Sequence, residues 1–172
     1  MLTTSIPCPM RPVLSEPLTT ENVLAVVHDL AADYIIQPKL NGDRVILRKT
    51  NGVIEVFNRH QSRYSFNVNA VIDWQDLPDN TTLDGEGYRG KFYPFEAIMD
   101  NASVEDRVAE ARRLCRLTGN AFIFDHPTDA WLTRCSANLP QWEGIVAKQR
   151  GTKYEWLTKP HHTSWQWLKL KF

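Results

Sequence analysis

The alternation of apolar and polar residues along the chain predicts strands more often than helices. Eight segments carry the two-residue period, or the short apolar run, of a buried strand: 34–40, 44–49, 53–58, 81–88, 91–99, 121–125, 143–149 and 165–171. Thr50-Asn51-Gly52 separates the second and third of these. It predicts a tight hairpin, because Asn and Gly tolerate positive φ.

Two longer segments have helical spacing instead. The first is expected to begin near 20–23, with a hydroxyl at its cap and an acid in its first turn, and to turn four residues toward a core: Leu24, Val27, Leu30 and Ala31. The second begins at Ser103-Val104-Glu105-Asp106, runs to about Leu117 and is closed by Gly119. A short helix is also expected over 68–74.

Strands joined by short turns, with helices between some of them, predict an α+β fold. The 172 residues, 42% of them hydrophobic, fit a single domain over 1–172, expected to be monomeric. No apolar run approaches the roughly 20 residues of a membrane span, and the first residues lack the features of a secretory signal. The three cysteines (Cys8, Cys115 and Cys135) form no CxxC pair and predict free thiols in the cytoplasm, or in a host cytoplasm if the source is viral.

Charge is balanced overall, with 20 basic and 20 acidic residues, but it is unevenly distributed. Residues 147–172 hold six Lys or Arg against one acid, whereas 73–110 hold ten acids against three bases. This asymmetry suits a cleft with phosphates on one wall and a metal on the other. Ordinary scatter over solvated faces is the alternative.

Candidate chemistry begins at Lys39-Leu40-Asn41-Gly42-Asp43-Arg44, directly after an apolar strand. A lysine amine held at a strand end can attack phosphorus once it is deprotonated. Taken alone, the run favours a surface lysine beside an Asn-Gly turn.

Four further motifs follow in order: Leu83-Asp84-Gly85-Glu86-Gly87, Phe92-Tyr93-Pro94-Phe95-Glu96-Ala97, Glu143-Gly144-Ile145-Val146-Ala147-Lys148 and Trp167-Leu168-Lys169-Leu170-Lys171. Together with the first run and the opening Arg11-Pro12-Val13-Leu14, they resemble the covalent nucleotidyltransferases over 11–172. These are the ATP-dependent DNA ligases, the RNA ligases and the mRNA capping enzymes, and the DNA ligases are the most similar. The resemblance implies two twisted, mostly antiparallel sheets with flanking helices (an ATP-grasp-like adenylation domain), with the nucleotide between them.

The resemblance also implies a three-step reaction. The lysine amine takes AMP from ATP and releases pyrophosphate, AMP passes to a 5′-phosphate end, and a 3′-hydroxyl displaces it to seal the strand. Lys39 matches the nucleophile, Gln37 the residue that reads the adenine amino group, and Arg44 a ribose or phosphate ligand; Leu40 lies between them in the same pocket. Asn41 departs from the usual Asp and removes a negative charge near the amine.

Other residues match the remaining nucleotide and metal ligands. Glu86, supported by Asp84, matches a ribose or metal ligand, and Glu143 matches the carboxylate that binds Mg²⁺ or Mn²⁺. Phe95 matches the aromatic that stacks on the purine. Arg59, Lys148, Lys169 and Lys171 match ligands of the nucleotide or its phosphates. The alternatives are a solvated arginine at 59, a core Phe at 95 and outward lysines on an edge strand. His161 and His162 are interpreted as loop residues.

The implied partners are nicked duplex DNA, with RNA as the alternative, and roles in DNA repair, replication or recombination, as in phage-type enzymes. No motif matches the OB-fold that follows this domain in DNA ligases and capping enzymes. Three interpretations stay open: a minimal ligase that works alone or with an OB-fold-bearing partner, the catalytic fragment of a longer protein, and a strand-end binder without sealing activity. An RNA ligase and a capping guanylyltransferase are the alternative enzymes.

Overall fold

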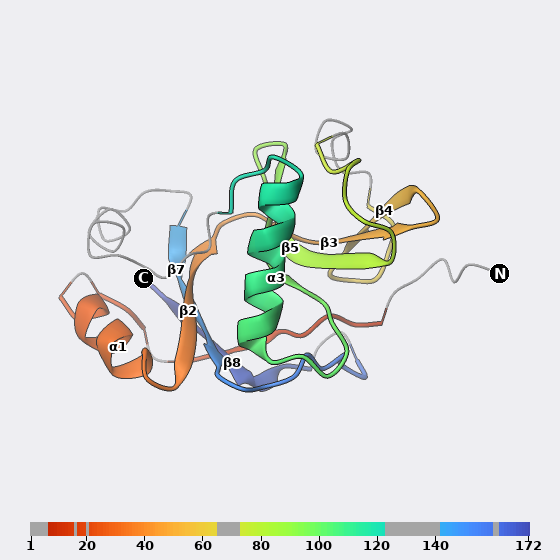
Figure 1. The fold of residues 1–172 in the computed structure, drawn as a ribbon. Helices are drawn as coiled ribbons and strands as arrows, with labels where there is room; N and C mark the ends of the chain where they lie inside the picture. The colour runs from red at the N-terminus through yellow and green to blue at the C-terminus, as the bar shows by residue number, and fades with distance from the viewer. Residues whose placement is uncertain (1–6, 16, 20, 65–72, 123–141, 160–161) are drawn as a thin grey trace.

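The computed structural model describes residues 7–15, 17–19, 21–64, 73–122, 142–159 and 162–172. They form two four-stranded sheets, ordered β1-β8-β7-β2 and β4-β3-β5-β6, with two helices (Figure 1). The elements are β1 (Pro12–Leu14), α1 (Val23–Leu30), β2 (Tyr34–Leu40), β3 (Asp43–Thr50), β4 (Val53–Asn58), β5 (Thr81–Tyr88), β6 (Lys91–Ala97), α3 (Val104–Leu117), β7 (Trp142–Gln149) and β8 (Ser164–Lys171). The predicted α+β fold with two mostly antiparallel sheets is confirmed.

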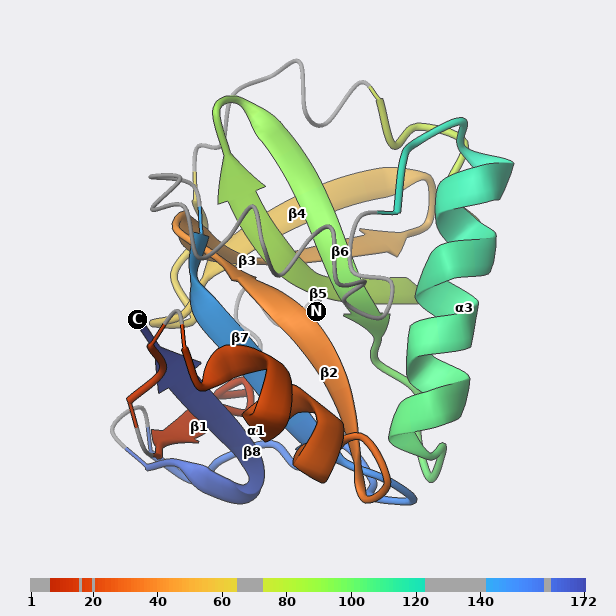
Figure 2. The same cartoon turned by 90° about the vertical axis from the view of Figure 1, so that its left-hand side faces the viewer.

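The first sheet is held against α1. β7 pairs antiparallel with β2 on one side and with β8 on the other, and β1 lies parallel to β8. Apolar residues on one face of these strands, among them Ile36, Ile145 and Leu170, pack against Val23 and the partly buried Val27 and Leu30 of α1. Figure 2 shows α1 lying across this sheet.

The second sheet carries the larger apolar core. β3 pairs antiparallel with β4 on one side and with β5 on the other, and β5 pairs antiparallel with β6. α3 packs beside β6 and contributes Ala111, Leu114 and Cys115 to a core that includes Leu47 and Trp74. Ser103 caps α3 by accepting a hydrogen bond from the Asp106 amide at 3.2 Å, as the sequence predicts.

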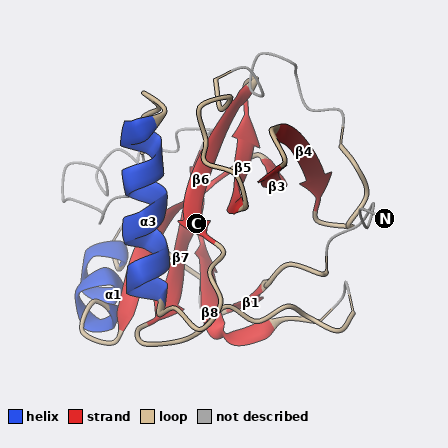
Figure 3. Cartoon of the chain, turned by 45° about the vertical axis from the view of Figure 1, so that its right-hand side comes forward, coloured by secondary structure: helices blue, strands red, loops and turns tan. Residues whose placement is uncertain are grey.

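The two sheets lie beside one another, and α3 stands along one side of both (Figure 3). The turn of residues 41–42 joins β2 of the first sheet to β3 of the second. Three polar contacts also cross between the sheets: the Gln37 side chain donates to the Phe95 carbonyl at 2.9 Å, Lys148 pairs with Glu96 at 3.2 Å, and Tyr154, which follows β7, donates to Asp84 at 2.8 Å. The site therefore lies where polar groups, rather than an apolar core, connect the two halves.

Several sequence predictions differ from the structure. Val27 and Leu30 face the core as predicted, but Leu24 is 48% exposed and Ala31 is exposed, because α1 starts at Val23 and buries Val23 in place of Leu24. Asn22 is the N-cap, makes no side-chain cap bond, and no acid lies in the first turn; Thr20 lies outside the described residues. β1 was not predicted, since three residues carry too little periodicity.

Other predictions fall wholly or partly outside the described residues. These are most of the expected helix at 68–74 and strand at 121–125, together with Cys135 and His161; Trp74 is in a turn, and Ala121 and Phe122 lie outside any strand. Cys8 and Cys115 are buried free thiols. Within the described residues, no helix is long and apolar enough to cross a membrane.

Candidate active site

A cavity of about 310 Å³ lies between the two sheets. All eleven residues predicted to bind nucleotide or metal line it, although they come from six strands and a loop: Gln37, Lys39, Leu40, Arg44, Arg59, Glu86, Phe95, Glu143, Lys148, Lys169 and Lys171. Pockets for small ligands in proteins have volumes of this order. The structure thus gathers the predicted residues in one place, while their roles stay predictions.

Lys39 stands near the end of β2, opposite β7. Its Nζ donates a hydrogen bond to Glu143 Oε2, and the same oxygen is 3.1 Å from Lys171 Nζ. Burial acts to raise the pKa of Glu143, but the hydrogen bonds from Lys39 and Lys171 outweigh it and the pKa is lowered. An ionised carboxylate therefore holds the amine of Lys39 at the cavity wall.

Gly42 fixes the turn that follows Lys39. A Cβ built there would lie 2.3 Å from the Gly87 carbonyl oxygen and 3.0 Å from Glu86 Cγ. Only glycine lets the β2–β3 turn approach β5 this closely. The close approach brings Lys39 and Glu86, from different sheets, to the same cavity.

The wall formed by β8 is cationic. Lys169 and Lys171 are two residues apart on one strand, so both side chains share a face, as predicted. Burial lowers the pKa of Lys169, and the nearby charges of Lys171, Lys39 and Arg11 lower it further. Seven cationic side chains line the cavity against two carboxylates, which suits a ligand with several phosphate charges.

Arg44 is held by Asp84 rather than reaching freely into the cavity. Its guanidinium makes a two-pronged hydrogen bond to the Asp84 carboxylate, which is completely buried and also accepts from the Tyr154 hydroxyl at 2.8 Å. Asp84 was expected to support Glu86; instead it orients Arg44, because the Arg44 guanidinium compensates its buried charge.

Glu86 faces the cavity in a less compensated environment. Burial raises the pKa of its carboxyl to about 7, although the charges of Arg44 and Lys39 oppose the increase. Near neutral pH this carboxyl is therefore poised between its protonated and ionised forms, and a bound cation would favour ionisation.

The opposite end of the cavity is aromatic. Phe95 and Trp167 meet edge to face with ring centroids 6.2 Å apart, and Gln37 is anchored there by its bond to the Phe95 carbonyl. Lys148 Nζ lies 4.3 Å and 4.1 Å from the centroids of these two rings. Lys148 was expected to point toward the pocket or the ribose-phosphate; it lines the cavity, where it is buried at the aromatic end.

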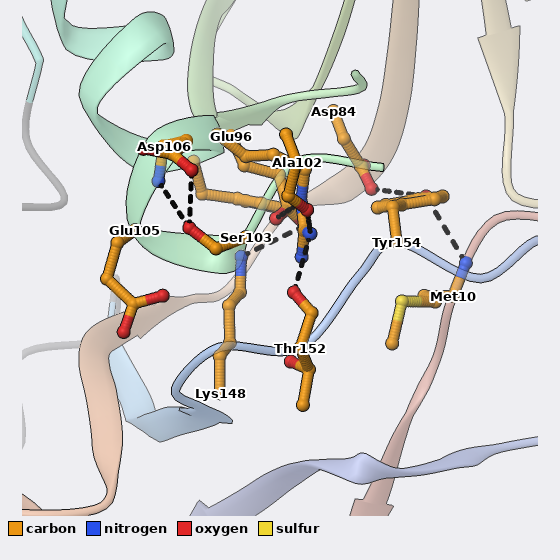
Figure 4. Close-up of polar contacts among 12 residues, drawn as sticks. Met10, Asp84, Glu96, Ala102, Ser103, Glu105, Asp106, Lys148, Thr152 and Tyr154 are labelled. Atoms are coloured by element: carbon orange, nitrogen blue, oxygen red, sulfur yellow. Dashed lines mark hydrogen bonds and ion pairs between the residues drawn. The ribbon is translucent and has the colours of Figure 1, made fainter. Parts of the chain in front are cut away.

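Behind this end lies a network of buried charges, part of which is drawn in Figure 4. Glu96 accepts from Arg107 Nε at 2.9 Å and pairs with Lys148 at 3.2 Å. Arg107 also donates to the carbonyls of Ala102 and Thr152 at 2.8 Å. Burial is the largest influence on Lys148 and lowers its pKa to about 8, against the opposing pull of Glu96. The network fixes Lys148 from β6, α3 and the segment after β7.

Sequence reasoning missed six lining residues: Arg11, Pro12, Pro38, Gly42, Val146 and Trp167. Each lies inside or beside a motif already noted, so adjacency was the available signal. Arg11 reaches the cavity because the Ser164 amide donates to its carbonyl at 2.7 Å, at the start of the β1–β8 pair.

A divalent cation fits this donor set through the oxygens of Glu86 and Glu143. Mg²⁺ is usually held by one or two carboxylates together with phosphate oxygens and water. Within the described residues, no group of three or more His, Cys, Asp or Glu forms a self-sufficient metal site. A cation here would therefore depend on ligands supplied by the nucleotide.

Comparison with known proteins identifies relatives of this chain. No family model matches it. The SPbeta prophage-derived DNA ligase-like protein LigB of Bacillus subtilis (strain 168) is 32% identical over 191 residues, covering 91% of this chain and 64% of the relative. The chain thus spans less than two thirds of that relative's length.

Solved ligase structures share the fold. The ligase domain of M. tuberculosis LigD is 17% identical, with a TM-score of 0.64 over 95% of this chain and 59% of that one. Mycobacterial DNA ligase D complexed with ATP and MES is 19% identical, with a TM-score of 0.62 over 94% and 60%. An archaeal ATP-dependent RNA ligase is 15% identical, with a TM-score of 0.55 over 94% and 48%.

These likenesses confirm the resemblance read from the ordered motifs. By sequence, the chain is similar to a DNA ligase-like protein over 91% of its length, and its fold is that of ATP-dependent ligase domains.

Proposed function

We propose that the chain is an ATP-dependent polynucleotide ligase that forms a covalent AMP adduct on Lys39. One observation carries the proposal: Lys39 and the ten other predicted ligands, from both sheets, line the same cavity. The curated relative, which is named a DNA ligase-like protein, favours DNA as the substrate. RNA is the second candidate, since an RNA ligase shares the fold.

The residues suit nucleotidyl transfer. The Lys39 amine, after losing a proton, would form a bond to the α-phosphorus of ATP as the bond to the β-phosphate oxygen breaks and pyrophosphate leaves. Lys169 and Lys171, on the adjacent wall, would neutralise charge on the phosphates. Mg²⁺ or Mn²⁺ held by Glu86 and Glu143 would neutralise charge on the same oxygens.

The aromatic end suits a purine. Phe95 and Trp167 offer apolar ring surface, and a nucleobase stacked on one of them would be stabilised by about 1–3 kcal/mol. The Gln37 amide nitrogen is engaged by Phe95, so its oxygen is turned away from that carbonyl and would accept from the adenine amino group. Guanine carries a carbonyl at that position and would repel this oxygen.

The first test is self-labelling with α-labelled ATP and Mg²⁺. We expect acid-labile, hydroxylamine-sensitive label on the wild-type protein and none on Lys39→Ala. Lys39→Arg should also fail, because a guanidinium stays protonated. Lys153→Ala, an exposed lysine outside the cavity, is the matched control and should label normally. Label that persists on Lys39→Ala would refute the assignment.

A second test separates the substrates. A pre-adenylated nick is offered in duplex DNA and in the corresponding RNA duplex, and sealing of each is measured. We expect the DNA nick to be sealed faster. Labelling by GTP in preference to ATP would indicate a capping-type guanylyltransferase, and self-labelling without sealing of either nick would leave adenylation as the activity.

A further inference from the structure

Two hairpins of the second sheet have the same two-residue turn but different residues in it. Asn51 (φ 52°) and Gly52 (φ 75°) connect β3 to β4, and Arg89 (φ 48°) and Gly90 (φ 75°) connect β5 to β6. Positive φ at both central positions is the signature of a type I′ turn, which strongly prefers Asn-Gly. The β3–β4 turn follows this preference and the β5–β6 turn does not.

Arginine at the first position of this turn is a strained choice. A left-handed conformation places Cβ close to the following carbonyl, and Asn tolerates it better than most side chains. Local strain that another residue would relieve often marks a functional position. The other hairpin has the less strained residue, Asn51, at the same position. Turn geometry therefore does not explain why residue 89 is an arginine.

The β5–β6 tip extends past the turn that follows the candidate nucleophile. Gly87, two residues before Arg89, pairs with Asp43, and its carbonyl lies against Gly42 in the turn after Lys39. At about 3.3 Å per strand residue, Arg89 is about 7 Å along the strand from that contact. Figure 2 shows the β5–β6 tip and the β2–β3 turn on the same side of the molecule.

The tip is cationic and open to solvent. Arg89 and Lys91 are both exposed, and neither makes an ion pair within the described residues; Arg89 rests on the Tyr88 ring at 5.2 Å. On the other side of the turn after Lys39, the Tyr64 hydroxyl donates to Asp43 at 3.0 Å and holds the loop that carries Arg59 and Arg63. Two acids lie among these residues: Asp43, which pairs with Gly87 in the sheet, and Glu55, which forms an ion pair with Arg63.

We propose that Arg89 and Lys91 at the β5–β6 tip bind backbone phosphates of the duplex beside the strand end that reaches Lys39. The inference rests on the proposed function and extends it to a surface outside the nucleotide cavity, since neither residue lines that cavity. Contacts of this kind hold the duplex in position without reading its sequence.

Arg89→Asn is the decisive variant, because it moves two measurements in opposite directions. Replacing the arginine by the residue of the other hairpin should relieve the turn and raise the Tm by about 2 °C. It should also weaken binding of a nicked DNA duplex roughly tenfold at low salt, since a charge-assisted contact is lost. The slope of log K against log salt should fall by about 1, and adding Lys91→Gln should reduce it by about 1 more.

Two controls match this variant. Asn51→Arg creates the strained turn at the other hairpin and should lower the Tm without strengthening duplex binding. Arg116→Asn removes an exposed arginine near the end of α3 and should leave both the affinity and the salt slope unchanged.

Self-labelling with ATP, measured in parallel, separates this inference from the proposed function. A wild-type protein that does not label would contradict the proposed function, whatever the tip binds. Arg89→Asn protein that labels but binds the duplex as tightly and as salt-dependently as wild type would overturn the inference. Absence of duplex binding by the wild-type protein at low salt would overturn it as well.

Discussion

At the residue scale, Glu86 lowers the stability of the fold that holds it. Burial raises its pKa from an ordinary 4.5 to about 7, so the folded protein holds this proton more tightly than the unfolded chain. Stability is therefore lost as pH rises from about 4.5 through 7. Without nucleotide, Glu86→Gln should exceed wild type by about 2 kcal/mol in free energy of unfolding at pH 8, and by little at pH 4.5. Urea unfolding at the two pH values measures this. Arg113 lowers the pKa of Glu110, so Glu110→Gln should instead lose some stability at pH 8. If the difference in free energy of unfolding between Glu86→Gln and wild type were the same at pH 4.5 and pH 8, the pKa of Glu86 would not be its cause.

At the scale of elements, the β7–β8 pair depends on Gly144. Its φ is 141°, and a Cβ there would lie 1.9 Å from the Leu170 carbonyl oxygen, in the strand that carries Lys169 and Lys171. Gly144→Ala must push the strands apart next to Glu143. We expect a loss of about 2–4 kcal/mol in free energy of unfolding, together with much slower self-labelling. Gly52→Ala is the control: its φ is also positive, but nothing lies within 4 Å of its added Cβ, so a loss of about 1 kcal/mol and normal labelling are expected. Equal losses for the two variants would mean that the close approach is unimportant.

At the scale of the whole molecule, a bound nucleotide should join the two halves. The cavity is lined by strands of both sheets, so ATP would contact both and would bind the folded state alone. At about 100 times its Kd, ATP should add about 2.7 kcal/mol to the free energy of unfolding. Calorimetry of Lys39→Ala with ATP and Mg²⁺ measures this without covalent adduct formation. GTP at the same concentration should raise the Tm less, and an equal shift with GTP would contradict adenine selection by Gln37.

Prediction from the sequence succeeded where periodicity or motif order was strong. The long strands and α3 have periodic patterns and recognisable caps, and the ordered motifs brought eleven lining residues to one cavity. It failed where tertiary contacts decide. The face that α1 buries depends on the sheet beneath it, which leaves Leu24 exposed. The partners of Asp84 and Lys148 depend on Arg44, Glu96 and Arg107, which no local pattern connects.

The polar contacts between the two sheets affect how the cavity between them, here called the cleft, would open. The contacts named between the halves are hydrogen bonds and ion pairs, together with a small apolar cluster of Ile35 with Val104 and Val108 of α3 and the ring contacts of Phe95 with Trp167 and Lys148. Each half has its own apolar core. Widening the cleft about the α3 side would therefore expose little apolar surface. Such a motion carries a small heat-capacity change and responds weakly to urea, in contrast to unfolding of either core. In hydrogen exchange, amides lining the cleft should become accessible at urea concentrations that leave both cores protected, so ligand entry and global unfolding are separable events in this molecule.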